Sequence, residues 1–434
     1  MMRVYRADRL IDGTGAAPQS NMDILVDDSG RILDIVPVGT REYPEESIVY
    51  VNADKTVLPG FIDVHTHLMF GEEGRSYRDV WANDSDGMML LRGPRNAYLH
   101  LRAGVTTLRD CGAVRNVGFD LKAGADAGYF LSPRLLVCGR PLTITGGHFW
   151  WCGQEADGVD GVRKAVRQLL KDGADFLKIM CDGGSLKDTY ASFTVEELTV
   201  AVEEIHRVGK RAVAHCEAAD AIDRAAEAGI DEIEHINFLQ PDGSRVWDQR
   251  IADKILNKGL YVCPTIQTGW RRVQKLQAKE ELGTLTPEEK ALLDTGLYKT
   301  HSKMEFIRRF YEMGVPIVAG TDSIAVFGDY AIGLELLHRA GLSPMDTIRA
   351  ATSVAAASIS MDDQIGTVKP GMLADLVYVD GDPLLDVATL GKVCAVVQGG
   401  QLVIDKRFEG LEIAGAPMAA DSLLFHYKGS PNIS

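Results

Sequence analysis

The chain has 434 residues, of which 46% are hydrophobic and 25% are charged. This composition fits a folded globular protein and excludes a mainly disordered, collagenous or disulfide-scaffold chain. The 46 Lys and Arg residues against 61 Asp and Glu residues give a net charge of −15. Such an acidic chain is a poor match for nucleic-acid phosphates or an anionic membrane surface.

The same composition bears on location. The first residues carry charges in place of an apolar segment, which argues against a signal peptide. No stretch reaches the about 18 apolar residues that a membrane helix needs. The seven cysteines are scattered without a Cys-x-x-Cys pair, a usage typical of reduced thiols. We therefore expect a cytoplasmic protein with no nucleic-acid or membrane partner.

Both ends of the chain predict short β-strands. Near the start, residues 23–26 and 31–36 are β-rich runs separated by turn residues, which is the pattern of a hairpin. Residues 375–379 and 393–401 repeat this pattern near the far end. Neither end offers many core residues alone, so we expect one small composite β-sandwich domain assembled from both termini.

The long middle segment alternates apolar runs with helical patterns. Two of the helical stretches are Val159–Lys171 and Thr194–Val208, the second with Thr194 and Glu197 in capping-box positions. Eight β-then-α units indicate an α/β protein with a TIM (β/α)8 barrel, and a doubly wound open sheet is the competing interpretation. The eight candidate strands are 61–67, 104–110, 134–138, 175–180, 211–215, 232–236, 260–264 and 316–322.

One connection is too long for a plain loop between a strand and a helix. Residues 270–307 are charged and helix-prone, and they follow the seventh candidate strand. On a barrel this segment would lie at the face that carries the active site, so it is either a lid or a solvated peripheral helix pair.

Polar residues interrupt the apolar strands near their C-terminal ends, where barrel enzymes keep their catalytic groups. His65 and His67 are two residues apart and so point to the same side of a strand. His215, His235 and Asp322 end three further strands. Two histidines on one side suit a divalent metal, and the joint pattern predicts a metal site.

Lys178 lies inside the apolar fourth strand, where an unpaired ammonium would cost several kcal/mol. One resolution is a partner carboxylate. Another is carboxylation by CO2, which converts the amine into an anionic carbamate able to bridge two metals.

The motifs together resemble the amidohydrolase superfamily of binuclear metal-dependent hydrolases. The resemblance rests on residues 58–67, 176–179, 214–215, 233–235, 319–322 and 366–377. It implies a distorted (β/α)8 barrel with a two-part β domain. The expected organisation is a β domain from 1–58 and 362–415, a barrel from 59–361 and a tail from 416–434, in which Leu423–Phe425 can dock on the barrel or a neighbouring subunit.

Within the superfamily, the run from Thr145 to His148 and residues 154–158 are similar to the branch of Xaa-Pro and Arg/Lys carboxypeptidases and related amidases. This resemblance implies two divalent metals, zinc first and cobalt or manganese as alternatives. The buried metal would be bound by His65, His67 and Asp322 and the more exposed one by His215 and His235, with carboxylated Lys178 between them. His148 would reach the substrate carbonyl.

The implied reaction is hydrolysis of an amide-type C–N bond in a small molecule, an N-acyl amino acid or a dipeptide, by a metal-bridging hydroxide. Asp322 would take the proton of the hydroxide and pass it to the leaving nitrogen. Relatives commonly form homo-oligomers, so we expect one here.

Three stretches depart from the branch pattern close to the predicted metals: 149–152, 179–182 and 216–217. A urea or carbamate hydrolase acting on an aromatic or xenobiotic substrate therefore stays open. Trp150, Trp151 and Trp270 either line an aromatic cleft or pack the barrel mouth, and Cys181 and Cys216 are candidates to approach the metals.

Other activities of the superfamily fit the sequence less well. Deaminases usually lack the lysine of the fourth strand and carry a His-x-x-Glu pattern, where this chain has His215 and Ala218. A lactonase would use the same two-metal centre, but the Thr-Gly-Gly-His run argues against it. A non-catalytic scaffold would have lost metal ligands, whereas all six predicted ligand positions are present here.

Overall fold

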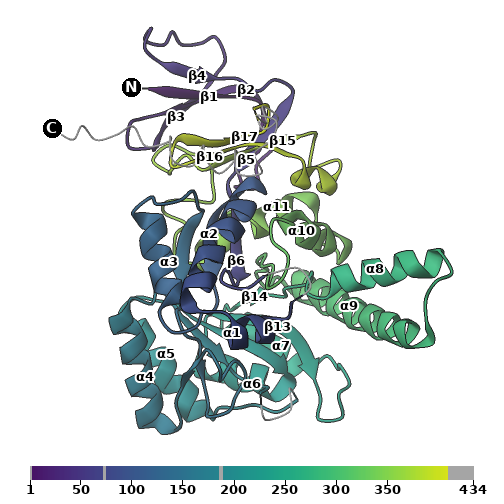
Figure 1. Ribbon diagram of the computed structural model, residues 1–434. Coiled ribbons are helices and arrows are strands. Elements are labelled where there is room, and N and C mark those ends of the chain that lie inside the picture. The colour runs from purple at the N-terminus through teal and green to yellow at the C-terminus, as the bar shows by residue number, and fades with distance from the viewer. Residues whose placement is uncertain (1, 72–74, 185–188, 409–434) are drawn as a thin grey trace.

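Strands from the two ends of the chain share one sheet, at the top of Figure 1. The structure is a computed structural model that describes residues 2–71, 75–184 and 189–408. The sheet order is β17-β16-β15-β5-β1-β2-β3, with β4 parallel to β1. Its members are β1 (Arg3–Leu10), β2 (Gln19–Val26), β3 (Ile32–Pro37), β4 (Ile48–Tyr50), β5 (Lys55–Pro59), β15 (Leu376–Asp380), β16 (Val393–Gln398) and β17 (Gln401–Asp405).

This pairing confirms that strands from both ends of the chain join in one sheet, and the sandwich form of the domain stays a prediction. Strand β5 from the first part of the chain runs antiparallel to β15 from the last part, with Pro59 opposite Leu376. The predicted hairpin near the start is β2 and β3. Buried apolar residues from both ends form a common core, because each end supplies one part of it. The tail 416–434, including Leu423–Phe425, lies outside the described residues, and the domain boundaries stay predictions.

Parallel strands build the middle of the molecule in two hydrogen-bonded groups. The first group has the order β6-β7-β8 and the second the order β10-β9-β11-β12-β13-β14. They are β6 (Phe61–Thr66), β7 (Val105–Asp110), β8 (Arg134–Val137), β9 (Leu142–Thr143), β10 (Gln154–Glu155), β11 (Leu177–Met180), β12 (Ala212–Ala218), β13 (Glu232–Leu239) and β14 (Tyr261–Cys263). Seven of the eight candidate strands of this region are thereby confirmed.

The eighth candidate strand, 316–322, is not a regular strand. Its backbone is bonded on one side to β14, where Val318 N donates to Val262 O at 3.0 Å. On the other side Val64 N of β6 donates to Ala319 O at 3.2 Å. The segment therefore lies between β14 and β6, but only isolated bridges form, and Asp322 near its end has a left-handed φ of 52° that ends an extended run.

Helices follow the strands and cover their outer side (Figure 1). The predicted helices are confirmed as α4 (Gly158–Asp172) and α5 (Val195–His206), and Thr194 and Glu197 form the predicted capping box. The others are α1 (Tyr77–Asn83), α2 (Asp86–Arg102), α3 (Val117–Asp126), α6 (Ala219–Ala228), α7 (Gln249–Asn257), α8 (Trp270–Glu281), α9 (Pro287–Met313), α10 (Tyr330–Arg339), α11 (Pro344–Ala350) and α12 (Ser353–Ser358), with a 3-10 helix at Val387–Gly391.

The long connection after β14 is a helical hairpin, α8 and α9, which projects from the body of the molecule in Figure 1. Helix α9 begins with Pro287 behind a capping box of Thr286 and Glu289. Ion pairs such as Lys290–Glu280 at 2.7 Å join the two helices. The predicted helical character of this connection is therefore confirmed, and the inner face of the hairpin borders the site described below.

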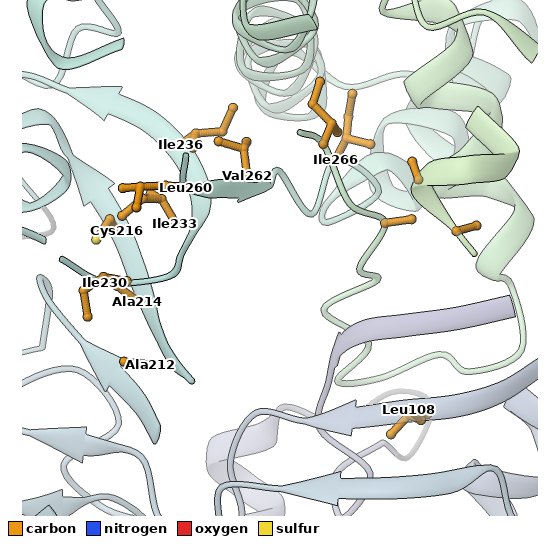
Figure 2. Close-up of a cluster of buried hydrophobic side chains, with 14 of the residues drawn as sticks. Leu108, Ala212, Ala214, Cys216, Ile230, Ile233, Ile236, Leu260, Val262 and Ile266 are labelled. Carbon is orange, nitrogen blue, oxygen red and sulfur yellow. The ribbon is translucent and has the colours of Figure 1, made fainter. Parts of the chain in front are cut away.

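The main core lies between the strands and their helices. Figure 2 shows part of it, where apolar side chains of β12, β13 and β14, among them Ala214, Ile233 and Val262, gather with neighbouring residues such as Ile266. Since strand residues alternate between two faces, this packing turns the intervening polar residues to the other side. None of the described helices has the length and apolar content needed to cross a membrane.

Candidate metal centre

The predicted site residues meet at the C-terminal ends of the strands. The ring centroids of His65 and His67 are 5.4 Å apart, and those of His65 and His235 are 5.2 Å apart. His215 lies 4.4 Å from His235, and His148 stacks on His215 at 4.5 Å. Four separate segments thus bring five imidazoles into one cluster.

Asp322 completes this cluster. Its Oδ1 lies 3.5 Å from His65 Nε2 and 3.6 Å from His67 Nε2. Thr268, in the loop after β14, donates its hydroxyl to Asp322 Oδ2 at 3.2 Å. The Asp322 carboxylate is therefore held with one oxygen facing two histidines.

All the predicted site residues, Lys178 included, line one cavity of about 450 Å³. Ligand sites for small molecules have about this size. The rest of the wall comes largely from the α8–α9 hairpin, through residues such as Val273 and Leu292, and from Tyr77 and Phe149.

Burial keeps the histidines neutral. Loss of solvent lowers the pKa of His67 to about 3, of His148 to about 2 and of His215 to about 4. The pKa values of His65 and His235 are lowered well below 6.5 for the same reason. A neutral imidazole offers a lone pair, which is the form that binds a metal. Burial raises the pKa of Asp322 to about 6, against the opposing charge of Lys178.

Surrounding polar groups orient the imidazoles. His67 Nδ1 lies 3.1 Å from Gly112 O, which leaves Nε2 to face Asp322. His235 Nδ1 lies 2.7 Å from Thr265 Oγ1, and His215 Nε2 lies 3.2 Å from Asp182 Oδ1. Such outer contacts fix the ring orientation of metal-binding histidines.

Asp182 was missed by the sequence analysis. Besides facing His215, it accepts the backbone N–H groups of Glu217 and Ala218 at 2.6 and 2.7 Å, and so it holds the end of β12. The only signal for it in the sequence was its position directly after the fourth apolar run.

Lys178 has a partner carboxylate, as the first of its two predicted resolutions requires. Its ammonium pairs with Glu234, and both side chains are almost fully buried. Glu234 Oε1 also lies 3.1 Å from His65 Nδ1 and 3.5 Å from Arg109. Arg109 in turn pairs with buried Glu232. This network was not predicted, although Glu232 and Glu234 alternate with apolar residues in one strand.

Backbone strain is concentrated around the cavity. Asp322, His235 and Ile236 adopt left-handed φ values of 52°, 68° and 48°, and so do Phe149 at 60° and Thr265 at 45°. These conformations cost free energy in residues other than glycine, and they are typical of functional sites.

A glycine of the opposite loop places His148. Gly184 has a φ of +85°, and a Cβ added there would lie 2.1 Å from the carbonyl carbon of Gly147 and 2.5 Å from His148 N. Only a glycine permits this close approach, so Gly184 lets the loop that carries His148 reach the histidine cluster.

The donor set fits a divalent cation. The ligand atoms of His65, His67 and Asp322 all lie within 4.8 Å of one another, and His65, Cys111 and Glu234 form a second such group. Neutral imidazoles with a carboxylate suit zinc and related divalent metals.

The three predicted tryptophans pack around the site and are not lining residues. Trp151 stacks against Tyr77 at 5.7 Å, Trp150 is about half exposed, and Trp270 packs against the core. Tyr77 and Phe149 are the aromatic residues of the cavity wall among the described residues. Cys181 and Cys216 are likewise buried outside the wall.

Comparison with known proteins places this geometry in a family. The sequence model of the amidohydrolase family matches residues 56–403. Ochratoxinase from Aspergillus niger is 28% identical over 385 residues, which cover 80% of this chain and 75% of that protein.

Solved structures of similar sequence share this fold. A Xaa-Pro dipeptidase with methionine bound in its active site is 28% identical and superimposes with a TM-score of 0.79, covering 93% of this chain and 99% of the other. Molinate hydrolase, 21% identical over all of this chain and 99% of its own, shares the fold with a TM-score of 0.78. Members of the matched family typically bind metal ions. The chain belongs to the amidohydrolase family and is a hydrolytic enzyme that acts on C–N bonds.

Proposed function

We propose that this enzyme hydrolyses the amide bond of a small molecule, an N-acyl amino acid or a dipeptide, with two divalent cations, zinc first. We further propose that the strands of the middle segment close into the predicted (β/α)8 barrel. The observation that carries the proposal is the convergence of neutral imidazoles and the Asp322 carboxylate from separate strand ends in one cavity.

The proposed ligands are His65, His67 and Asp322 for one cation and His215 and His235 for the other. Lys178, carboxylated by CO2, would stand between them. Carboxylation replaces a positive charge by a negative one, so it removes the ion pair with Glu234 and leaves Arg109 and His65 beside that carboxylate. A carbamate next to Glu234 is repelled unless cations are present, and this couples the modification to metal binding.

The cations would supply Lewis acidity and a water of lowered pKa near neutral pH. Asp322 would accept the proton of the attacking water and deliver it to the leaving nitrogen, which is a poor leaving group unless protonated. His148, neutral and stacked on His215, would orient the substrate carbonyl. The names of two relatives at 28% identity, ochratoxinase and Xaa-Pro dipeptidase, support an amide substrate.

The first test measures metal content and activity in the same preparation. Elemental analysis should give about two divalent ions per chain, and a scaffold would hold none. The metal-loaded enzyme is then assayed on N-acyl amino acids, dipeptides, aryl ureas, carbamates and lactones. Turnover of ureas, carbamates or lactones without any amide would contradict the proposed substrate class.

Carboxylation of Lys178 has its own readout. Protein loaded with metal in ¹³C-bicarbonate should show a carbamate carbon resonance, and the Lys178→Met variant should lack it. If metal-loaded wild-type protein lacks this resonance, Lys178 is not carboxylated and stays paired with Glu234, which would contradict the proposed carbamate.

A further inference from the structure

The cavity wall carries cations that belong to no metal-ligand set. In the described part of the chain, the cavity-lining cations other than the histidines and Lys178 are Arg245, Arg272, Lys299 and Lys303. The lining carboxylates there are Glu217 and Asp322, and Asp322 already faces His65 and His67. Positive charge therefore exceeds negative charge along this wall.

Lys303 is the deepest of these cations. It lies on α9, only 8% of its surface is exposed, and its Nζ donates to Pro264 O at 2.9 Å. Among the described residues no carboxylate lies within 4.0 Å of it. A buried ammonium with a single carbonyl partner retains two donor positions, and burial without a counter-charge costs free energy. Such a side chain in a cavity wall is a site for an anion that comes from outside the chain.

Arg245 stands beside Lys303. It lies in the loop between β13 and α7, and its Nη1 donates to Lys299 O of α9 at 3.0 Å, which holds the guanidinium against the same helix. Arg245 also has no carboxylate within 4.0 Å among the described residues. The two cations repel each other, since the charge of Arg245 contributes to lowering the pKa of Lys303, after burial, to about 8.

Glu217 does not neutralise this pair. Burial lowers the pKa values of both cations and the charge of Glu217 only opposes this, while no ion pair forms between Glu217 and either of them in the described chain. A ligand carboxylate between Lys303 and Arg245 would satisfy both, and the planar guanidinium matches a carboxylate in a bidentate geometry.

The two cations are also close to the candidate metal centre. Both line the same cavity as His215, His235 and Asp322. In an N-acyl amino acid the carboxylate is separated from the scissile C–N bond by one carbon atom, so an anion site this near the metals fits that arrangement.

We propose that Lys303 and Arg245 bind the α-carboxylate of the substrate, and that the enzyme therefore selects N-acyl amino acids or dipeptides over neutral ureas and carbamates. This inference rests on the proposed function and narrows it. In this arrangement the acyl part lies toward the rest of the wall, where Tyr77 and Phe149 provide aromatic surface.

The test compares each carboxylate substrate with its neutral analogue. The probes are N-benzoyl derivatives of L-leucine, L-phenylalanine, L-methionine and L-proline and their carboxamides, assayed with the metal-loaded enzyme. We expect kcat/KM for the carboxylates to exceed that for the carboxamides by about 10- to 100-fold, since a charged hydrogen bond is lost in the amide.

Two variants remove the proposed contacts one at a time. In Lys303→Met and in Arg245→Gln the preference for carboxylate over carboxamide should fall about 10-fold or more, mainly through KM. Lys275→Met is the matched control, because Lys275 is exposed on α8 outside the cavity wall, and its preference should equal that of the wild type.

A purely structural role for Lys303 predicts a different result. Loss of its bond to Pro264 would lower the melting temperature and reduce the hydrolysis rates of the carboxylate and the carboxamide equally. If the preference for carboxylate over carboxamide is unchanged in both variants, the proposal is overturned. Calorimetric titration of N-benzoyl-L-phenylalanine gives a readout independent of turnover, with weaker binding expected in each variant.

The outcomes separate this inference from the proposed function. Hydrolysis of carboxamides, ureas or carbamates at rates equal to or above those of the carboxylates would overturn the inference and leave a C–N hydrolase. A protein with two metals per chain that hydrolyses none of the compounds would overturn the proposed function. In that case binding of N-benzoyl-L-phenylalanine that does not weaken in the variants would overturn the inference as well.

Discussion

At the scale of single residues, Asp322 contacts several parts of the site. Its carboxylate faces His65 and His67, and its backbone N–H donates to His65 O at 2.7 Å. Thr268 fixes the second carboxylate oxygen. The same side chain is thus placed to bind a cation and to move a proton.

The two roles of Asp322 can be separated by Asp322→Asn. The amide oxygen keeps the shape and can still bind a cation, but the amide cannot accept the proton of the attacking water. We expect metal content to fall less than twofold while kcat falls by about 10²- to 10⁴-fold. Elemental analysis and steady-state assays on the same preparation measure both, and unchanged turnover would refute the proton-transfer role.

Asp63 supports the histidines from behind. This fully buried carboxylate accepts His65 N at 3.1 Å, Thr321 N at 3.0 Å and the Thr321 hydroxyl at 2.7 Å. Burial raises its pKa to about 7, although these hydrogen bonds oppose the rise. It therefore ties the end of β6 to the segment that carries Asp322.

Replacement of Asp63 should affect metal binding without any contact with the cation. Asp63→Ala leaves the backbone N–H groups of His65 and Thr321 unpaired, whereas the Thr321 hydroxyl can still donate to His65 O. We therefore expect a loss of about 2–4 kcal/mol in the free energy of unfolding and about 10- to 100-fold in metal affinity. Asp63→Asn keeps an acceptor for both N–H groups and should lose less than half as much stability. Chemical denaturation and metal titration measure these effects. Equal losses in the two variants would contradict the proposed role of Asp63 in joining β6 to the segment that carries Asp322.

At the scale of secondary-structure elements, the terminal sheet contains a partly buried cross-strand ion pair. Arg6 of β1 lies directly opposite Asp23 of β2, and Asp23 accepts Arg6 Nε at 2.8 Å and the Tyr43 hydroxyl at 2.7 Å. Burial acts to raise the pKa of Asp23, but the hydrogen bonds from Arg6 and Tyr43 outweigh it and lower that pKa.

This pair makes stability depend on pH in a definite direction. Because folding lowers the pKa of Asp23, its contribution is fully present above the ordinary value of about 4 and is lost as the pH falls toward the lowered value. We expect Asp23→Asn to cost about 2 kcal/mol in the free energy of unfolding at pH 7 and less near pH 3.

Urea denaturation at several pH values measures this difference. Glu46→Gln, an exposed carboxylate of the same terminal region, is the control and should cost nothing measurable. A destabilisation by Asp23→Asn that stays constant between pH 7 and pH 3 would contradict the assignment.

The elements also show what the sequence could and could not predict. The histidines were predictable because His65 and His67 keep the period of two along a strand and the others end apolar runs. The predicted strand 316–322 is not regular because it forms only isolated bridges to its neighbours and the left-handed φ of Asp322 ends its extended run, neither of which the residue pattern encodes. The partner of Lys178 lies 56 positions away in Glu234, and only the adjacent placement of the strands reveals it.

Lys303 shows the same limit for a helix. Lys303 is buried, whereas Lys290 of the same helix forms an exposed ion pair with Asp294. The sequence around the two lysines does not tell them apart. Only the packing of α9 against the loop after β14 decides which lysine enters the cavity.

At the scale of the whole molecule, the terminal sheet is connected directly to β6, the strand that carries His65. Strand β5 leads through Gly60 directly into β6, and a Cβ at Gly60 would lie 2.1 Å from Thr106 Oγ1. The ion pair of Arg134 with Asp375 at 2.9 Å and the bond from Gln398 to Thr106 O at 3.0 Å tie the sheet to strands β8 and β7. The ends of the chain therefore fix the position of the strand that carries His65.

Removal of metal tests how far the site stabilises this whole assembly. The protein without cations keeps two buried ion pairs, Lys178 with Glu234 and Arg109 with Glu232, and its histidines are neutral. We therefore expect chelation to abolish activity and leave a cooperative unfolding transition. A ligand at about 100 times its Kd contributes about 2.7 kcal/mol per site, so the melting temperature should fall by about 5 °C or more and recover on addition of zinc.

The double variant His65→Asn/His67→Asn should show a smaller response to zinc, because one of the two proposed sites is removed. Calorimetric scans measure the melting temperature of the wild type and of the double variant. If the melting temperature is the same with and without two metals per chain, the cations bind folded and unfolded chains equally, which would contradict a preformed metal site.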